Sequence, residues 1–280
     1  MKVNIIVDST CDASPQIENK LITVPLTINI EGIEYIDGVT ITNKEFYEKL
    51  IESDSMPVTS QATPQAFIDI FKSIEEKGEE AVVITISSKL SGTYQSAMIA
   101  KEGFKNIHVV DSKSVAIGTG VLAELALKEA ESGKSAKEIQ AILEKERDNV
   151  TLIAMFDTLE YLKKGGRISK TAAIAGGLLS IKPVIRLNDG SVEIIGKARG
   201  SKQGNNLLIK EIEAIGGIDF TKPVMLGYTG LSDAILKKYI EDSAFLWKGN
   251  IDELRVALIG SVVGTHAGPG AVAAAFFNKR

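Results

Sequence analysis

Short apolar runs alternate with helical patterns along the first half of the chain. The runs at residues 3–7, 81–86 and 107–111 are rich in Val and Ile, which predicts buried β-strands. Strands and helices that alternate in this way are typical of a parallel α/β sheet. Apolar spacing and capping residues predict helices at 44–52, 65–77, 94–100, 118–132 and 136–147.

Two other stretches of the first half are extended. Residues 21–30 and 33–41 flank Glu31-Gly32, which predicts a hairpin-like turn. Asn43 is the predicted cap of the helix that follows. Ser135 and the glutamate three positions later match a capping box, which predicts the start of a further helix.

The pattern changes after about residue 150. Two strand-like stretches flank Asn188-Asp189-Gly190, a strong hairpin signal. We therefore expect an α/β protein with a parallel-sheet domain at 1–155, an α+β domain at 156–280 and a ligand tunnel between them. Strands are predicted at 152–156, 182–187, 191–197, 224–228 and 254–259, and helices at 158–164, at 169–180, up to 215, up to 246 and after 270.

Composition and charge restrict the class of protein further. The 280 residues are 44% hydrophobic and 24% charged, with a formal net charge of −4, which is typical of a soluble globular protein. Lys and Arg form no dense run, so a nucleic-acid partner is not expected, and no apolar segment approaches the ~18 residues of a membrane-spanning helix. The early charges do not fit a signal peptide, and the single cysteine, Cys11, is interpreted as a packed residue. We expect a cytoplasmic protein.

Serine follows three of the predicted strands, in Asp8-Ser9, Ser87-Ser88 and Asp111-Ser112. The carboxyl ends of parallel strands meet at one edge of a sheet, where ligands commonly bind. The loop from Ser87 to Thr93 adds further hydroxyls and a glycine before a predicted helix N-terminus, which favours an anion site. The alternative interpretation is ordinary helix capping.

Motifs for common cofactors are incomplete. Gly118-Thr-Gly120-Val-Leu-Ala123 fits the dinucleotide pattern, but the preceding strand ends near Asp111, too far away for the tight turn that the motif needs. No P-loop occurs. The two histidines, His108 and His266, belong to no Cys/His cluster, so no metal and no cofactor is expected. His108 lies inside a predicted strand and is interpreted as structural.

Three other residues are candidates for chemistry. His266 lies in a Gly/Pro-rich turn, where a rigid loop would present one titratable group. With Ser91 it could form the pair of a lipid-directed hydrolase or acyltransferase, although no Gly-x-Ser-x-Gly elbow is present. Arg167 follows two glycines and could reach an anion, whereas the two lysines before them are typical of a helix C-terminus.

Taken together, the motifs resemble the DegV family of bacterial fatty-acid-binding proteins. The resemblance spans nearly the whole chain, and each motif is weak alone. The residues that carry it are Asp8-Ser-Thr-Cys-Asp12, Pro57-Val-Thr-Ser-Gln61, Ile86-Ser-Ser-Lys-Leu-Ser-Gly-Thr-Tyr-Gln-Ser-Ala97, Val109-Val-Asp-Ser112, Leu159-Glu-Tyr-Leu-Lys-Lys-Gly-Gly-Arg-Ile168 and Gly264-Thr-His-Ala-Gly-Pro-Gly270.

The resemblance implies that one long-chain fatty acid is buried between two domains, without catalytic machinery in this chain. It implies that Thr59, Ser60 and Ser91 hold the carboxylate, that the backbone approaches it at Gly92, and that His266 and Arg167 lie near it. It also implies a fatty-acid kinase partner that makes an acyl phosphate for phospholipid synthesis, and it allows transient membrane contact. The kinase would contact Arg199 and Lys202, and the candidate tunnel residues are Ile86, Met98, Ile174, Leu178 and Leu179.

Physical chemistry is consistent with such a ligand. A carboxylate out of water needs several hydrogen bonds or a cation, and hydroxyls at a helix N-terminus can supply them. Burying each CH₂ of the tail contributes ~0.8 kcal/mol, or roughly 11 kcal/mol over about 14 methylenes, before the costs of association.

Overall fold

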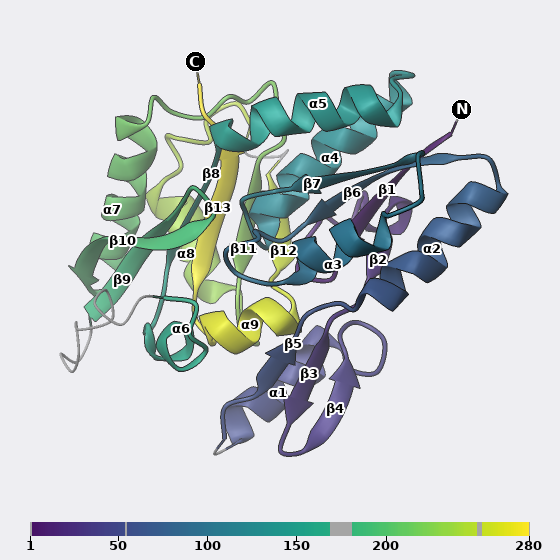
Figure 1. Ribbon diagram of the computed structural model, residues 1–280. Helices are drawn as coiled ribbons and strands as arrows, with labels where there is room; N and C mark the ends of the chain where they lie inside the picture. The colour runs from purple at the N-terminus through teal and green to yellow at the C-terminus, as the bar shows by residue number, and fades with distance from the viewer. Residues whose placement is uncertain (1, 54, 169–180, 251–253, 280) are drawn as a thin grey trace.

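The computed structural model describes residues 2–53, 55–168, 181–250 and 254–279, which form two main β-sheets with helices packed on their faces (Figure 1). The first sheet is parallel throughout, as the alternating pattern predicts. Its carboxyl-terminal strand ends therefore share one edge. In spatial order its strands are β2 (Ile22–Val24), β1 (Val3–Asp8), β6 (Glu80–Thr85) and β7 (Ile107–Asp111).

The second sheet has six strands of mixed direction. In spatial order they are β10 (Ser191–Arg199), β9 (Ile181–Asn188), β8 (Val150–Met155), β13 (Val272–Phe277), β11 (Met225–Tyr228) and β12 (Arg255–Leu258). The predicted hairpin is present: β9 and β10 pair antiparallel around Asp189 and Gly190, which both have positive φ. Strand β8 pairs with β9 and β13. The division of the chain into two domains at residue 155 stays a prediction. Because β8 pairs within the second sheet, a boundary before β8 fits the strand pairing better.

A third, antiparallel sheet projects below the first one (Figure 1). Its strands are β4 (Ile33–Ile36), β3 (Thr27–Ile30) and β5 (Val58–Ser60). The predicted turn joins β3 to β4, with φ of 53° at Glu31 and 86° at Gly32. Two successive positive φ values match the right-handed twist of a two-residue hairpin.

Helices cover the faces of these sheets. None in the described part of the chain is long and apolar enough to cross a membrane. The α-helices are α1 (Asn43–Glu52), α2 (Pro64–Glu76), α3 (Thr93–Ala100), α4 (Ile117–Glu131), α5 (Ala136–Glu146), α6 (Glu160–Lys164), α7 (Gly200–Ala214), α8 (Ala234–Asp242) and α9 (Ser261–Ala267), and the 3₁₀ helices are η1 (Glu18–Lys20) and η2 (Arg147–Asn149).

Helix starts follow the predicted capping chemistry with one correction. Ser135 caps α5 in a complete capping box, as predicted. The structure also shows Thr63 as the cap of α2, with Pro64 at the first helical position. The cap of α1 is Thr42, whose hydroxyl accepts from the backbone N–H of Glu45, and not Asn43 as predicted. Asn43 is already helical, and its side chain accepts a hydrogen bond from Ser261 Oγ.

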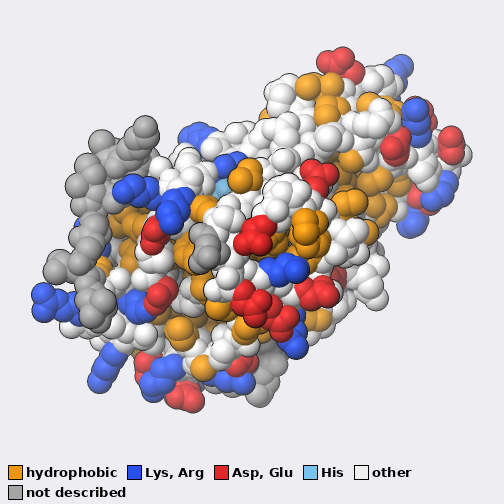
Figure 2. Space-filling view, turned by 90° about the horizontal axis from the view of Figure 1, so that it is seen from below, with side chains coloured by type: hydrophobic (Ala, Val, Ile, Leu, Met, Phe, Trp, Pro, Cys, Tyr) orange, Lys and Arg blue, Asp and Glu red, His pale blue; other side chains and the backbone are white. Residues whose placement is uncertain are grey.

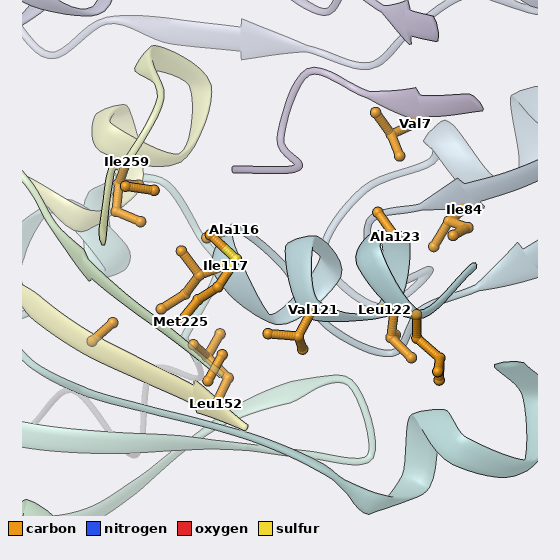
Figure 3. Close-up of a cluster of buried hydrophobic side chains, with 14 of the residues drawn as sticks. Val7, Ile84, Ala116, Ile117, Val121, Leu122, Ala123, Leu152, Met225 and Ile259 are labelled. Carbon is orange, nitrogen blue, oxygen red and sulfur yellow. The ribbon is translucent and has the colours of Figure 1, made fainter. Parts of the chain in front are cut away.

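Helix α4 packs between the two main sheets. Figure 3 shows Val7 and Ile84 of the first sheet on one side of α4, and Leu152 and Met225 of the second sheet on the other. Its glycines permit this packing: a Cβ at Gly118 would lie 2.0 Å from Ser114 Oγ, and one at Gly120 would lie 2.3 Å from the carbonyl oxygen of Asp12. The dinucleotide-like pattern therefore has a structural explanation.

The end of the chain is the main error of the sequence prediction. The apolar segment after Gly270 was expected to be helical, because alanine strongly favours helices. It forms strand β13, in which all six residues, Val272–Phe277, are buried. The strand lies between β8 and β11, with helices on both faces of the sheet, so both rows of its side chains are buried. Tertiary packing overrides local propensity here.

Candidate functional site

A cavity lies between the second sheet and the carboxyl edge of the first. The space between its atoms amounts to about 940 Å³, counting the solvent at its opening. Alternate residues of a strand face one side, and here that side is apolar and contains several small residues. These lining residues are Leu152, Ala154, Phe156, Ile185, Leu187, Val192, Gly227, Ala271 and Ala273.

Polar side chains also line the cavity, and six of them are called the polar group below. Thr59 on β5 and His266 on α9 are joined by a hydrogen bond of 2.9 Å between Oγ1 and Nε2. The side chains of the group are Thr59, Ser60, Gln61, Ser91, Arg167 and His266. The structure thus brings five of the predicted carboxylate-site residues to one cavity, and their role in binding stays a prediction.

His266 differs from its predicted setting. It lies in the last turn of α9, and the Gly/Pro-rich turn begins after it, at Gly268 with φ of 69°. Burial, with a further contribution from the Arg167 cation, lowers the pKa of His266 to about 4. The imidazole is therefore neutral at pH 7. Its buried Nδ1 has no partner among the described residues, and a Cβ at Gly165 would lie 2.1 Å from that atom.

Ser91 is oriented by its neighbours. Its Oγ lies 2.9 Å from Thr93 Oγ1 and accepts from the backbone N–H of Thr93 at 3.3 Å. Thr93 Oγ1 in turn accepts from the backbone N–H of Ala62 at 3.3 Å. Gly92 does not line the cavity but caps α3, and a Cβ there would lie 2.0 Å from Gln61 Oε1.

Arg167 is held at the cavity by backbone carbonyls. Its Nε donates to the carbonyl of Leu90 at 3.3 Å, and one terminal nitrogen donates to the carbonyl of Gly165 at 2.6 Å. Within the described residues no acidic side chain forms an ion pair with it. An arginine that lines a cavity and has no carboxylate partner is suited to receive an anionic ligand.

The serines at the strand ends do not form the expected anion site. Ser9 Oγ accepts from the backbone N–H of Leu26, Ser88 Oγ donates to Asp111, and Ser112 Oγ donates to the carbonyl of Ser114. None of the strand-end serines, Ser9, Ser87, Ser88 and Ser112, lines the cavity. They lie at the predicted edge and stabilise its turns, but none of them caps a helix: Gly92 precedes α3 and Ala116 precedes α4.

The predicted tunnel residues have different outcomes. Ile86 lines the cavity. Met98 does not, because it packs in the cluster on the opposite face of the first sheet, among α1, α2 and α3. Ile174, Leu178 and Leu179 lie outside the described residues. Sequence reasoning missed the cavity residues Thr10, Gln61 and Thr229, of which Thr10 and Gln61 belong to motifs that were singled out.

The geometry does not assemble a hydrolase. Ser91 and His266 share no hydrogen bond, since Ser91 is paired with Thr93 and His266 with Thr59. Burial raises the pKa of the Cys11 thiol well above its ordinary value, which disfavours the nucleophilic thiolate. In the described ranges no three His, Cys, Asp or Glu side chains are grouped to hold a metal ion.

Comparison with known proteins identifies the family of this chain. The family model described as uncharacterised proteins of the DegV family matches residues 2–279. A DegV domain-containing protein of Caldanaerobacter subterraneus is 35% identical over 285 residues, covering 100% of this chain and 99% of that protein. A solved structure on fatty acid binding of a DegV family protein from Thermus thermophilus is 31% identical, with a TM-score of 0.88 and 100% of both chains covered. A stearic acid-binding protein from Eubacterium ventriosum is 28% identical, with a TM-score of 0.86, covering 100% of this chain and 99% of the other. The chain therefore belongs to the DegV family.

Proposed function

We propose that the protein binds one long-chain fatty acid, with the tail in the cavity and the carboxylate at the polar group. The observation that carries this proposal is that one cavity has both apolar walls and the polar group, which includes Arg167. An anion with a long apolar tail matches both parts. The fatty-acid-binding relative from Thermus thermophilus and the stearic acid-binding relative from Eubacterium ventriosum support this ligand class.

Two hydroxyl protons are available for the carboxylate in this arrangement. If Thr93 donates its hydroxyl proton to Ser91, the Ser91 proton is free to point at the ligand. Neutral His266 can donate from Nε2 to Thr59, which frees the Thr59 proton in the same way. Arg167 then supplies the charge. Hydroxyls that already accept hydrogen bonds are polarised, and they donate more strongly.

Native mass spectrometry of the purified protein tests the proposal. We expect an added mass that solvent extraction identifies as a fatty acid, and binding of added stearate to protein stripped of lipid. Persistent absence of lipid together with no binding of added fatty acid would overturn it. A fluorophosphonate probe distinguishes the hydrolase alternative, because labelling of Ser91 is expected only for an activated nucleophile.

We also propose that the bound acid is presented to a fatty-acid kinase. Ser60 and Gln61 line the cavity and are exposed, so the polar group lies close to solvent. Figure 2 shows the face of the molecule that is seen from below. On this face Lys and Arg gather on the side where β9 and α6 lie, whereas Asp and Glu gather over α1. Arg199 and Lys202 are exposed at the junction of β10 and α7, and they are the candidates for docking.

The docking residues are tested by charge reversal. Arg199→Glu with Lys202→Glu should lower acyl-phosphate formation by an added fatty-acid kinase without changing fatty-acid affinity. Unchanged phosphorylation would remove these residues from the interface. Transient membrane contact stays a prediction from the resemblance.

A further inference from the structure

The hairpin β9–β10 is part of the cavity wall, yet a short ladder attaches it to its sheet. Strand β9 has eight residues, Ile181–Asn188, but pairs with β8 at Val184, Ile185 and Arg186, and the backbone N–H of Phe156 adds a hydrogen bond to the carbonyl of Pro183, away from the turn. Leu187 and Val192 face each other beyond that ladder, next to the turn, and both line the cavity. Pairing with β8 therefore does not hold this part of the wall in place.

The first half of the chain holds the hairpin tip instead. Ser87 Oγ donates to the carbonyl of Gly190 at 2.8 Å in a buried contact. The Asp189 carboxylate pairs with Lys89 Nζ at 2.5 Å and with Lys113 Nζ at 3.1 Å. Gly190 has a φ of +78°, and a Cβ there would lie 2.4 Å from Ser87 Oγ, so glycine allows the tip to approach this closely.

The same loop that holds the tip also builds the polar group of the cavity. The carbonyl of Ser87 accepts the backbone N–H groups of Leu90 and Ser91, at 2.9 and 3.2 Å. Leu90 lines the cavity, and its carbonyl accepts from Arg167. The segment from Ser87 to Ser91 thus connects the hairpin tip with the proposed carboxylate site through short, direct contacts.

We propose that the hairpin is a latched wall of the acyl cavity, closed by the Asp189 clamp to Lys89 and Lys113, and that opening of this latch is the step that lets a fatty acid enter and leave. The inference rests on the proposed function. Exposed ion pairs are individually weak and are screened by salt, which suits a contact that must open repeatedly. Ser87 and Gly190 define the register to which the tip returns.

The release rate of cis-parinaric acid, a fluorescent long-chain fatty acid, tests the latch. Protein loaded with this probe is mixed with excess non-fluorescent stearate, which occupies the emptied cavity, and the loss of fluorescence as the probe enters water is followed by stopped flow. Asp189→Asn should release the probe roughly three- to tenfold faster, as expected for loss of two exposed pairs to one carboxylate. Raising the KCl concentration should accelerate release from the wild type and have little effect on Asp189→Asn.

The matched control is Glu193→Gln on the same hairpin. Glu193 pairs with Arg186 of β9, so its ion pair does not connect the hairpin to the first half of the chain. This variant should release the probe at the wild-type rate. Equal release rates for Asp189→Asn and Glu193→Gln, while the wild type still binds the probe, would overturn the latch but leave the proposed function unaffected.

A second variant keeps the test valid if Asp189→Asn folds poorly. Lys89→Gln removes one pair of the clamp from the other side and should also accelerate release. Because both residues act in one clamp, the double variant should be no faster than Asp189→Asn, whereas additive effects would contradict a shared latch. Failure of the wild type to bind the probe at all would instead overturn the proposed function, and the latch with it.

Discussion

Thr59 Oγ1 and His266 Nε2 lie 2.9 Å apart, although 207 positions separate the two residues in the chain. The contact joins β5 of the small sheet to α9, which packs against α1 and α6. A buried, neutral imidazole can hold a hydroxyl without bringing a second charge to the site, so Arg167 supplies the cation of the polar group. The two residues thus set the orientation of a donor before any ligand arrives.

Removal of a single hydroxyl from the polar group should weaken fatty-acid binding. Ser91→Ala or Thr59→Ala should each cost ~1–3 kcal/mol of binding free energy, because one carboxylate lone pair loses its donor. Displacement of a fluorescent fatty acid measures the affinity. Ser88→Ala is the matched control, since the Ser88 hydroxyl donates to Asp111 and lies outside the cavity. Unchanged affinity in both cavity variants would place the carboxylate elsewhere.

Gly165→Ala should displace the His266 ring. The added Cβ would lie 2.1 Å from Nδ1, and the backbone at Gly165 has a φ of −72°, which alanine adopts freely. We therefore expect weaker fatty-acid binding with little loss of stability. Gly166→Ala is the comparison, because Gly166 has a φ of +71° and nothing within 4 Å of the new Cβ, so it adds backbone strain without touching the histidine. Equal effects on affinity from both variants would argue against the imidazole position.

Local signals predicted most of the fold. The turn at Asp189-Gly190, the capping box at Ser135 and the parallel strands of the first sheet all follow from short-range patterns, and each is present. Strand β13 could not be predicted in this way, because its alanine-rich run becomes extended only through pairing with β8 and β11, which come from distant parts of the chain. The misplaced cap of α1 has a similar origin, since Asn43 is recruited by Ser261 from far along the chain.

The candidate site was likewise predicted only in part from the sequence. Thr59, Ser91 and His266 were singled out from motifs and lie together, but periodicity alone gave no indication that Thr59 and His266 touch. The strand-end serines were expected at the site because they share the edge of one sheet. Whether a hydroxyl faces a ligand or a neighbouring backbone group depends on turn geometry, which the residue type does not encode.

The pH dependence of stability should report the buried imidazole. The pKa of His266 is about 4 in the folded protein, against an ordinary value of 6.5. The unfolded chain therefore takes up a proton at higher pH than the folded one. The contribution of neutral His266 to the unfolding free energy is complete above pH 6.5. It is lost as the pH falls toward 4, by at most about 1.4 kcal/mol per pH unit.

Urea unfolding of the wild type and of His266→Gln between pH 7.5 and 4 measures this effect. The difference in unfolding free energy between the two proteins should fall in the same pH range. Burial raises the pKa values of Asp8, Asp12 and Asp37, so these groups act in the opposite direction and favour the folded state at low pH. Both proteins contain them, and the comparison removes their contribution. A pH-independent difference would contradict the buried, neutral state of His266.

Adjacent alanines of β13 should respond oppositely to the same substitution. Ala273 faces the cavity, so in Ala273→Leu the larger side chain occupies the space proposed for the acyl tail. This variant should keep its thermal stability but bind stearate weakly. Ala274 belongs to the core cluster on the other face of the sheet, where Ala274→Leu should overpack and cost about 1–3 kcal/mol of unfolding free energy. Calorimetry gives the stability and probe displacement gives the affinity. Stearate binding that survives in Ala273→Leu would show that the tail follows a different path, because the leucine side chain would block an acyl chain packed against this strand.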